Sequence, residues 1–298
     1  MPDRLKIALV GAGHMGRLHA RTIAARGDAR LVAVCDTDAA AAAALAETYG
    51  ARALEEAEGL AGAVDAVVLA AATSAHRDLA LPLIRAGVPL LVEKPLAGTA
   101  AEAREIARAA QRADAVLQVG HILRFDPVTR AIAERTFTPA EIRVSWRSPF
   151  TGRSTDISVV MDLAIHGIDL ALQWAGGFPE EVTATGRTVK GPHTDEVEVH
   201  LEFAGGCAAD LVASRVSDSR ERRIRITAAG ETIELDYAAR TARWGSEALP
   251  VEAGPDALTA QMNAFLAAVR GEAPVAVSAD EGARAVEVAE RIERAAAV

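Results

Sequence analysis

The chain has 298 residues, a length that favours two domains over a single core. Half of the residues are hydrophobic, 24% are charged and the formal net charge is −9, a composition that is typical of a soluble globular protein and disfavours nucleic acid, which needs a basic face. No apolar run approaches the ~18 residues of a membrane-spanning helix, and Cys35 and Cys207 are too few for a disulfide framework, so we expect a cytoplasmic protein without a membrane partner.

A glycine-rich loop follows the first predicted strand, residues 5–10, and precedes a predicted helix that runs to about residue 26. The pattern G-x-G-x-x-G between a strand and a helix is typical of dinucleotide binding, because the glycines permit a tight turn, close approach of the pyrophosphate and close helix packing. The helix start also offers N–H groups and a partial positive charge to the phosphates. We predict cofactor contacts at Gly11, Gly13, His14, Met15 and Gly16.

An acidic residue ends the second predicted strand, residues 30–35. Asp36 lies twenty residues after Gly16, where a carboxylate can accept hydrogen bonds from the adenosine ribose. A carboxylate there repels a 2′-phosphate, and Thr37 and Asp38 supply no basic partner for one. The sequence therefore predicts NAD as the cofactor, rather than NADP. The alternative is a loop of small residues in some other α/β protein.

Strands and helices alternate up to residue 120. After the alanine-rich helix 38–49 we predict a strand at 64–71, a helix to about 86, a strand at 90–95, a helix at 99–113 and a strand at 115–119. This repetition predicts a doubly wound parallel sheet. Thr73 and His76 follow one of these strands and are candidate cofactor contacts, although His76 is equally consistent with a histidine near a helix cap that has no chemical role.

The run from Leu90 to Pro95 ends a short apolar strand with a carboxylate, an amine and a proline. Ligands bind at this end of the strands in open α/β sheets, so Glu93 and Lys94 are candidate cofactor-binding residues. Pro95 restricts the conformation of Lys94, and an X-Pro bond in such a turn can be cis. The alternative is a strand that ends in a solvated Glu-Lys pair.

The pattern changes after residue 120. His121 and Arg124 follow at the expected crossing between domains, a usual place for a substrate pocket. Strands are predicted at 141–146, 196–203, 207–213, 222–228 and 232–237, and helices at 258–269 and 279–296. We therefore predict an α/β protein: an NAD-binding Rossmann domain at 1–120, and at 121–298 an α+β domain with a largely antiparallel sheet and helices on one side. Residues 279–298 are a candidate to pack back on the first domain.

A helix predicted at 161–175 carries polar residues on an apolar background. Asp162 and His166 are four residues apart and share a face, and Asp169 lies three residues beyond His166. The catalytic interpretation makes His166 a general base with Asp162 beside it. One alternative is a core histidine that is held by its own aspartate. A metal site at these three residues is disfavoured because no other His/Cys cluster stands nearby, so we predict no metal.

Five arginines lie between residues 215 and 225. The favoured interpretation is a solvated hairpin edge. The alternative is a phosphate clamp for a charged substrate, in which at least one of Arg124, Arg215 and Arg220 lines the substrate site.

Three motifs together resemble the Gfo/Idh/MocA oxidoreductases over the whole chain: GAGHMG after the first strand, EKP at 93–95, and MDLAIHGIDL at 161–170. The resemblance implies that Lys94, Asp162 and His166 occupy catalytic positions. It also implies pyridine-nucleotide-dependent oxidation of a sugar or cyclitol hydroxyl, or the reverse reduction. A homo-oligomer, a dimer or tetramer formed through the outer face of the second-domain sheet, is a further implication.

Three longer stretches look like the branch that includes UDP-N-acetylglucosamine 3-dehydrogenases: VGHILRF at 119–125, TDISVVMDLAIHGIDL at 155–170 and ASRVSDSRERRIRIT at 213–227. That branch more often has Asp where this chain has Gly167. The likeness predicts a nucleotide-linked amino sugar as substrate, in contact with His121, Arg124, Asp162 and His166. The alternatives are a dehydrogenase of a free sugar or inositol, and a non-catalytic NAD- or sugar-binding regulator on the same fold.

Overall fold

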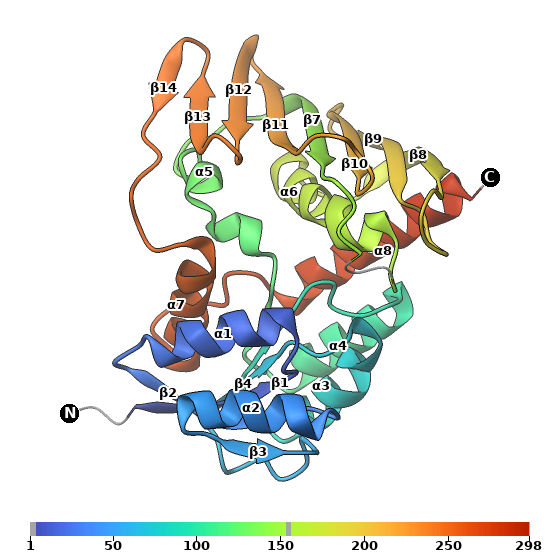
Figure 1. Ribbon diagram of the computed structural model, residues 1–298. Helices are drawn as coiled ribbons and strands as arrows, with labels where there is room; N and C mark the ends of the chain where they lie inside the picture. Colours follow the sequence, from blue (N-terminus) through green and yellow to red (C-terminus); the bar gives the residue numbers. More distant parts are fainter. Residues whose placement is uncertain (1–3, 153–155, 298) are drawn as a thin grey trace. The chain divides into compact units, whose positions relative to one another are not determined.

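The computed structural model describes residues 4–152 and 156–297 and divides into two compact units (Figure 1). The first unit contains the chain up to His121 together with Leu258–Ala283, and the second contains Ile122–Ala257 together with the residues from Arg284 onward. Residues 258–283 thus cluster with the first unit, although the sequence-based division at residue 120 placed them in the second. Thr155 and Val298, which belong to segments interpreted above, lie outside the described residues.

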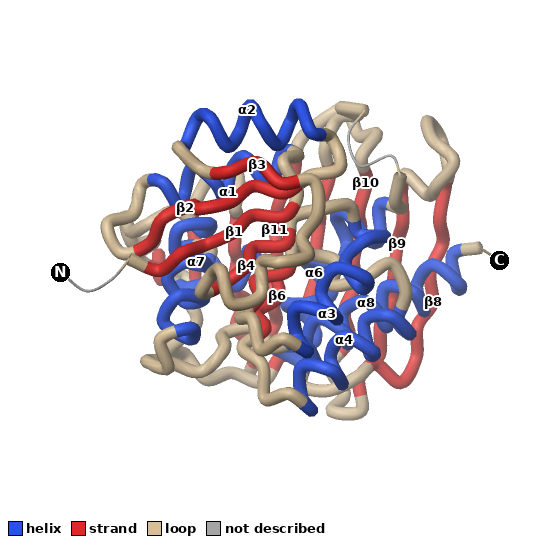
Figure 2. The backbone as a smooth tube through the Cα atoms, turned by 90° about the horizontal axis from the view of Figure 1, so that it is seen from below, coloured by secondary structure: helices blue, strands red, loops and turns tan. Residues whose placement is uncertain are grey.

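The first unit contains a six-stranded sheet in the order β3-β2-β1-β4-β5-β6, and every pair of neighbours is parallel. Figure 2 shows β3, β2, β1 and β4 side by side. The strands are β1 (Leu5–Val10), β2 (Ala29–Cys35), β3 (Arg52–Leu54), β4 (Ala66–Leu69), β5 (Leu90–Val92) and β6 (Leu117–Val119). The predicted doubly wound parallel sheet is confirmed. Strand order reverses between β1 and β4, which is the position where such sheets bind their ligands. The short edge strand β3 was not predicted, because its three largely exposed residues give no buried pattern.

Two helices of the first unit begin at residues that provide side-chain caps. The Asp38 carboxylate accepts the N–H groups of Ala40 and Ala41, and the Thr99 hydroxyl accepts that of Glu102. These bonds satisfy backbone donors that a helix start otherwise leaves unpaired. The helices before the final pair are α1 (His14–Ala24), α2 (Ala39–Tyr49), the short 3₁₀-helix η1 (Thr73–Ala75), α3 (His76–Arg85) and α4 (Ala100–Arg112).

Helix α7 (Ala257–Val269) is held in the first unit by its apolar face. Met262, Phe265 and Leu266 are fully buried in the same cluster as Ile7 and Leu9 of β1. Burial of each such side chain contributes roughly 1.5–3 kcal/mol, so removing α7 from this core would be costly. Packing therefore places this C-terminal segment in the first unit, together with the N-terminal part of the chain. The last helix, α8 (Ala279–Ala296), has its first five residues in the first unit and the rest in the second.

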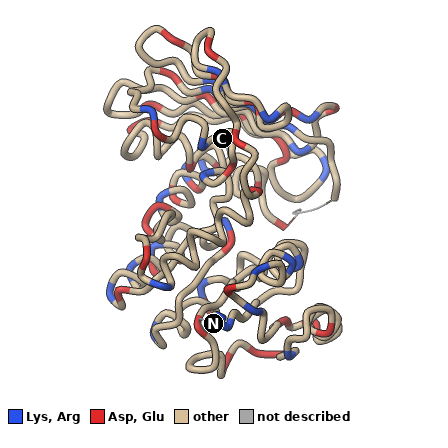
Figure 3. The backbone as a smooth tube through the Cα atoms, turned by 90° about the vertical axis from the view of Figure 1, so that its left-hand side faces the viewer, with Lys and Arg blue, Asp and Glu red and all other residues tan. Residues whose placement is uncertain are grey.

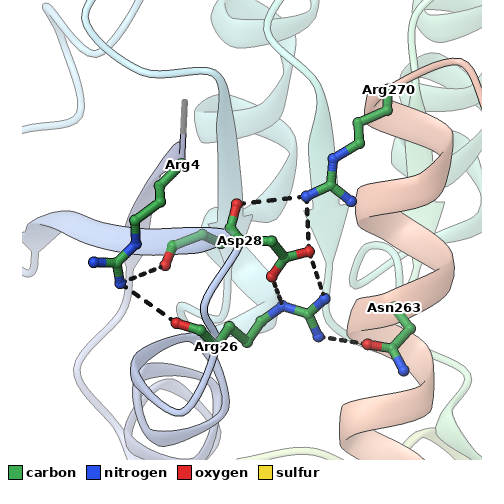
Figure 4. A network of polar contacts seen from close by, with 6 residues as sticks. Arg4, Arg26, Asp28, Asn263 and Arg270 are labelled. Carbon is green, nitrogen blue, oxygen red and sulfur yellow. Dashed lines mark hydrogen bonds and ion pairs between the residues drawn. The ribbon is translucent and has the colours of Figure 1, made fainter. Parts of the chain in front are cut away.

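A polar network fastens α7 to the first strands (Figure 4). The Asp28 carboxylate accepts hydrogen bonds from Arg26, at 2.8 Å from its Nε, and from Arg270 just beyond α7, at 2.7 Å. Arg26 also donates to Asn263 of α7, and Arg4 donates to the carbonyl groups of Arg26 and Ala29. The hydrogen bond from Arg26, supported by Arg270, lowers the pKa of Asp28 to about 2.

The second unit contains an eight-stranded sheet in the order β14-β13-β12-β11-β7-β10-β9-β8. Its pairs are antiparallel except β7 with β10, which confirms the predicted largely antiparallel sheet. The strands are β7 (Pro139–Arg147), β8 (Pro179–Arg187), β9 (Glu196–Phe203), β10 (Ala208–Ser214), β11 (Glu221–Ala228), β12 (Glu231–Asp236), β13 (Thr241–Trp244) and β14 (Glu247–Leu249). In β9 the alternation seen in the sequence places Val197, Val199, Leu201 and Phe203 on the buried face.

Helices cover one face of this second sheet. Helix α6 (Ile165–Ala175) packs on β7 and β10, and α8 approaches β8, where Arg291 donates to the carbonyl groups of Pro179 and Glu180. The helix predicted at 161–175 is not uniform, because its first turn is a π-helix, η3 (Val160–Ala164), that continues into α6. Such wide turns are frequent at functional sites. Two short helices, η2 (Ile122–Phe125) and α5 (Pro127–Arg130), complete the unit.

Charged residues of both signs are scattered along the backbone of each unit (Figure 3). No helix within the described ranges 4–152 and 156–297 has the length and hydropathy needed to cross a membrane.

We expect Asp28→Asn to lower the free energy of unfolding at pH 7, because the amide cannot replace a carboxylate between two arginines. Because Asp28 is partly exposed, solvent screening limits this decrease in the free energy of unfolding to about 1 kcal/mol. The folded-state pKa is depressed, so the stabilisation is present above the unfolded pKa near 3.8 and is lost as the pH falls toward about 2. Urea unfolding at several pH values measures it. Asp114→Asn, at an exposed turn, is the control and should leave the curve unchanged. A pH-independent difference for Asp28→Asn would contradict this account.

Candidate active site

The glycine loop is shaped by close backbone contacts. Gly11 has a φ of +104°, and a Cβ placed on it would lie 2.4 Å from the carbonyl oxygen of Ala70. A Cβ on Gly16 would lie 1.9 Å from the carbonyl oxygen of Gly11. At Gly13, by contrast, an added Cβ would meet nothing within 4 Å. The first and third glycines are therefore required by the fold itself, whereas the second faces open space in which a ligand can approach the backbone.

The start of α1 lies at this open side. Gly13 occupies the N-cap position and provides no side-chain cap, so the positive end of the helix is available to an anion. His14 is exposed and Met15 is half-buried in the first turn of this helix. The residues present therefore fit a pyrophosphate at the helix start.

Asp36 is fixed beside the loop. Its two carboxylate oxygens accept the N–H groups of Ala12 at 2.6 Å and Asp38 at 2.8 Å, which leaves further lone pairs for ribose hydroxyls. Asp36 also lines a cavity of about 720 Å³ that begins at the glycine loop. The described lining residues include no Lys or Arg. Five of them carry a carboxylate: Asp36, Glu55, Glu56, Glu58 and Asp78. A 2′-phosphate would meet only negative charge here, so the cavity fits NAD better than NADP.

Glu93 is a buried anion rather than a surface group. Its Oε1 lies 2.7 Å from Nε2 of His19 on α1, and its Oε2 accepts the backbone N–H of Lys94 at 3.2 Å. Burial raises the pKa of Glu93, but the hydrogen bond and charge of His19 and the charge of Lys94 outweigh this and hold the pKa below its ordinary value. Gly120 packs against it, because a Cβ there would lie 3.0 Å from the Glu93 Cα. His19 was not predicted. It lies 74 residues from Glu93, and no local pattern marks that pair.

The turn after Glu93 presents Lys94. The Lys94–Pro95 peptide bond is cis, and Lys94 is half-exposed while Glu93 and Pro95 on either side are buried. Beneath the turn, His76 places Nδ1 3.0 Å from the Pro95 carbonyl oxygen and Nε2 3.1 Å from that of Ala71. Burial lowers the pKa of His76. This histidine thus supports the EKP turn, and Thr73 begins η1 in the same connection.

In the second unit, Asp162 and His166 are half-exposed, and the chain neighbours of His166 are buried. Asp162 lies in the π-helical turn η3 and His166 in the first turn of α6. The His166 ring lies 6.4 Å from the Trp146 ring, between centroids. Gly167 packs on β7, where an added Cβ would lie 2.8 Å from a side-chain methyl group of Val144. An aspartate at this position would not fit the described packing.

Asp169 and Arg124 form an ion pair inside the second unit. The Arg124 guanidinium binds the buried Asp169 carboxylate through two hydrogen bonds, of 2.8 and 2.6 Å. Asp169 therefore has a structural partner, distinct from the Asp162 and His166 pair. His121 is buried at the end of the first unit. No set of three or more His, Cys, Asp or Glu side chains is arranged to hold a metal within the part of the chain that the structure describes.

Arg215 is likewise committed to an internal ion pair. Its Nε donates to Asp195 at 2.7 Å and its Nη1 to the carbonyl oxygen of Ile157 at 2.8 Å. Burial raises the pKa of Asp195, but the N–H groups of residues 189–191 in the preceding loop and the Arg215 hydrogen bond bring it to about 2. Two of the three arginines considered for a phosphate clamp, Arg124 and Arg215, are thus bound to buried carboxylates, while Arg220 is exposed.

Comparisons with known proteins agree with this geometry. Residues 5–121 match the model of an oxidoreductase family with an NAD-binding Rossmann fold, and residues 131–234 match the Gfo/Idh/MocA C-terminal domain. UDP-N-acetylglucosamine 3-dehydrogenase of Acidithiobacillus ferrooxidans is 32% identical over 96% of this chain and 95% of that protein. Inositol 2-dehydrogenase of Rhizobium meliloti is 30% identical over 98% of this chain and 97% of that protein. A solved structure of the Acidithiobacillus enzyme aligns with a TM-score of 0.92 at 32% identity, over 98% of each chain.

The fold and the glycine-loop cavity define an oxidoreductase that binds NAD. More narrowly, the chain belongs to the Gfo/Idh/MocA family, as its motifs predicted.

We expect the double substitution Asp36→Ser with Thr37→Arg to shift cofactor preference toward NADP(H). It removes the carboxylate that faces the ribose and supplies a cation for a 2′-phosphate, an exchange that should change the affinity ratio by roughly tenfold or more. Fluorescence titration with NADH and NADPH measures both affinities. Thr37→Ser, which keeps the acid, is the control and should behave as wild type. Tighter binding of NADPH than of NADH by the wild-type protein would contradict the assignment.

Proposed function

We propose that the protein is an NAD-dependent dehydrogenase of a nucleotide-linked amino sugar, acting on a ring hydroxyl or, in reverse, on the ketone. The observation that carries the proposal is the exposure pattern at two motifs: Lys94 and His166 are half-exposed between buried neighbours, and Asp162, one helical turn before His166, is also half-exposed. The sugar nucleotide is supported by the VGHILRF, MDLAIHGIDL and ASRVSDSRERRIRIT stretches, and by the similarity to UDP-N-acetylglucosamine 3-dehydrogenase.

The proposed chemistry assigns one role to each residue. His166 removes the proton from the substrate hydroxyl, and Asp162 orients or polarises this group. Lys94 donates a hydrogen bond to the same oxygen and stabilises the negative charge that develops on it. NAD, when bound, supplies the hydride acceptor. Glu93 takes no part in proton transfer, because it is buried and its carboxylate is occupied by His19 and the backbone of Lys94.

Two other functions compete with this proposal. Oxidation of a free sugar or inositol is supported by the 30% identity to an inositol 2-dehydrogenase. A non-catalytic regulator that binds NAD or a sugar on the same fold is disfavoured, because such a protein has no need of Lys94, Asp162 and His166 together.

Two wider properties belong to the same proposal. A homo-oligomer, dimer or tetramer, would form through the outer face of the second sheet, which carries paired charges of both signs such as Arg225 with Glu234 and Arg223 with Asp236. A cytoplasmic location is supported by Cys35 and Cys207, which are free and buried.

We expect Lys94→Ala and His166→Ala each to lose most of kcat while the protein still binds NADH. Loss of a general base alone typically costs ~10²–10⁴-fold. Steady-state turnover and NADH fluorescence separate the two effects. Lys190→Ala and His200→Ala are matched controls, because these side chains lie on exposed or outer-sheet positions, and both should retain wild-type turnover. A His166→Ala enzyme with wild-type kcat would leave only the structural interpretation of this histidine.

The substrate class is tested by titrating the NADH-bound enzyme with UDP-N-acetylglucosamine, UDP and myo-inositol. We expect saturable binding of the sugar nucleotide and weaker binding of UDP, because the diphosphate supplies charge that a free cyclitol lacks. Calorimetry measures each affinity. Saturable binding of myo-inositol, without binding of UDP or UDP-N-acetylglucosamine, would contradict the sugar-nucleotide proposal and favour the cyclitol alternative.

A further inference from the structure

Arg222 lies on the helix-covered face of the second sheet. It is the second residue of β11, where Ile224 and Ile226 on the same side of the strand are buried. Across the pair of strands it stands directly opposite Trp146 of β7. Its guanidinium carbon lies 5.6 Å from the centroid of the Trp146 ring, a cation–π contact.

Arg222 differs from the other arginines on strands β7 to β11 in having no carboxylate partner. Five of the six arginines on β7 to β11 form ion pairs, and they are Arg143, Arg147, Arg187, Arg223 and Arg225. Among the described residues Arg222 forms none, and its Nε, which is shielded from solvent, has no hydrogen-bond partner. The five paired arginines are on the opposite, outer face. Of these six arginines, only Arg222 points inward, and its N–H donors are available to another group.

The surroundings keep this cation fixed and weakly solvated. The backbone carbonyl of Arg222 accepts the N–H of Tyr237 at 2.9 Å, and the Tyr237 ring lies 5.2 Å from the Trp146 ring. The Tyr237 hydroxyl is held in turn by Thr129 at 2.8 Å. Burial lowers the pKa of Arg222, and the nearby charge of Arg220 lowers it further. Two cations close together favour the arrival of an anion.

The same indole connects Arg222 to the candidate catalytic residues. The centroid of the Trp146 ring lies 6.4 Å from that of the His166 ring and 5.6 Å from the guanidinium carbon of Arg222. Asp162, from the π-helical turn, and Asp126, at the N-cap of α5, act on Arg222 through their charges. All of these residues belong to the second unit, so the arrangement does not depend on how the two units are placed.

We propose that Arg222, stacked on Trp146, binds the oxyanion of the substrate, a phosphate or a sugar carboxylate, and so makes the enzyme specific for anionic sugars. The proposal rests on the dehydrogenase function given above, whose substrate it narrows. A planar guanidinium with free terminal nitrogens binds an oxyanion through two parallel hydrogen bonds, and stacking pre-orders the plane. The alternative role is structural: Arg222 would merely balance the charges of Asp126 and Asp162.

The test compares Arg222→Gln and Arg222→Lys with Arg223→Gln, the neighbouring arginine on the outer face that is paired with Asp236. Affinities of the NADH-bound enzyme are measured by calorimetry for UDP-N-acetylglucosamine, UDP, glucuronate and uncharged N-acetylglucosamine. We expect Arg222→Gln to weaken binding of the sugar nucleotide by roughly 10- to 100-fold and to leave the uncharged sugar unaffected. Arg222→Lys, which keeps charge but loses the planar fork, should show a smaller loss, and Arg223→Gln none.

The ligand arms identify the source of the oxyanion. Dependence of UDP binding on Arg222 indicates phosphate recognition, and dependence of glucuronate binding indicates carboxylate recognition. Equal losses for charged and uncharged sugars, or wild-type affinity for all anions in Arg222→Gln, would overturn the proposal. Should that variant fail to fold, wild-type affinity in Arg222→Lys would overturn bidentate binding.

Turnover separates this inference from the proposed function. If wild-type enzyme does not oxidise sugar nucleotides with NAD⁺ but binds UDP or glucuronate in an Arg222-dependent way, the proposed function fails and the anion site stands. If sugar nucleotides are oxidised and Arg222→Gln has an unchanged KM for them, the function stands and the anion site fails.

Discussion

The structure depends on one buried hydrogen bond, 2.7 Å long, between His19 and the carboxylate of Glu93. It joins the helix that follows the glycine loop to the strand end that carries Lys94. A buried charged group that loses its partner typically costs about 3–5 kcal/mol, so the bond between His19 and the Glu93 carboxylate holds the cofactor-binding loop and the EKP turn in a single arrangement. Gly120 and His76 support it, the first by leaving room for Glu93 and the second by contacting the Pro95 carbonyl. Glu93 thereby has a structural role, and the neighbouring Lys94 is the residue that we propose for the chemistry.

The second unit separates its charges in a similar way. Its most buried ion pairs, Arg124 with Asp169 and Arg215 with Asp195, hold segments of the domain together. Of the half-exposed polar groups, His166 and Arg222 both lie near the Trp146 ring, and Asp162 acts on Arg222 through its charge. Burial therefore distinguishes structural from functional charges more clearly than residue type does, since arginine and aspartate occur in both sets.

Local signals in the sequence predicted most of the fold and part of the candidate site. The caps Asp38 and Thr99, the alternation in β9 and the glycine loop are decided within a few residues, so a pattern can reveal them. The chain alone could not predict which buried groups meet across long separations: His19 with Glu93, or Arg124 with Asp169. For the same reason the sequence-based division placed α7 in the second domain, because only its packing on β1 shows where its apolar face is buried. Strand β8, mostly exposed, gave no pattern at all.

The central claim is that Glu93 is an ionised structural anion which positions Lys94 and leaves proton transfer to other groups. An infrared difference spectrum between the wild-type protein and Glu93→Gln tests this directly, because carboxylate and protonated carboxyl groups absorb in separate regions. The account predicts carboxylate bands at pH 7 that persist on acidification through the ordinary titration range of glutamate, since His19 and Lys94 hold the pKa of Glu93 down. A protonated carboxyl band at pH 7 would contradict it.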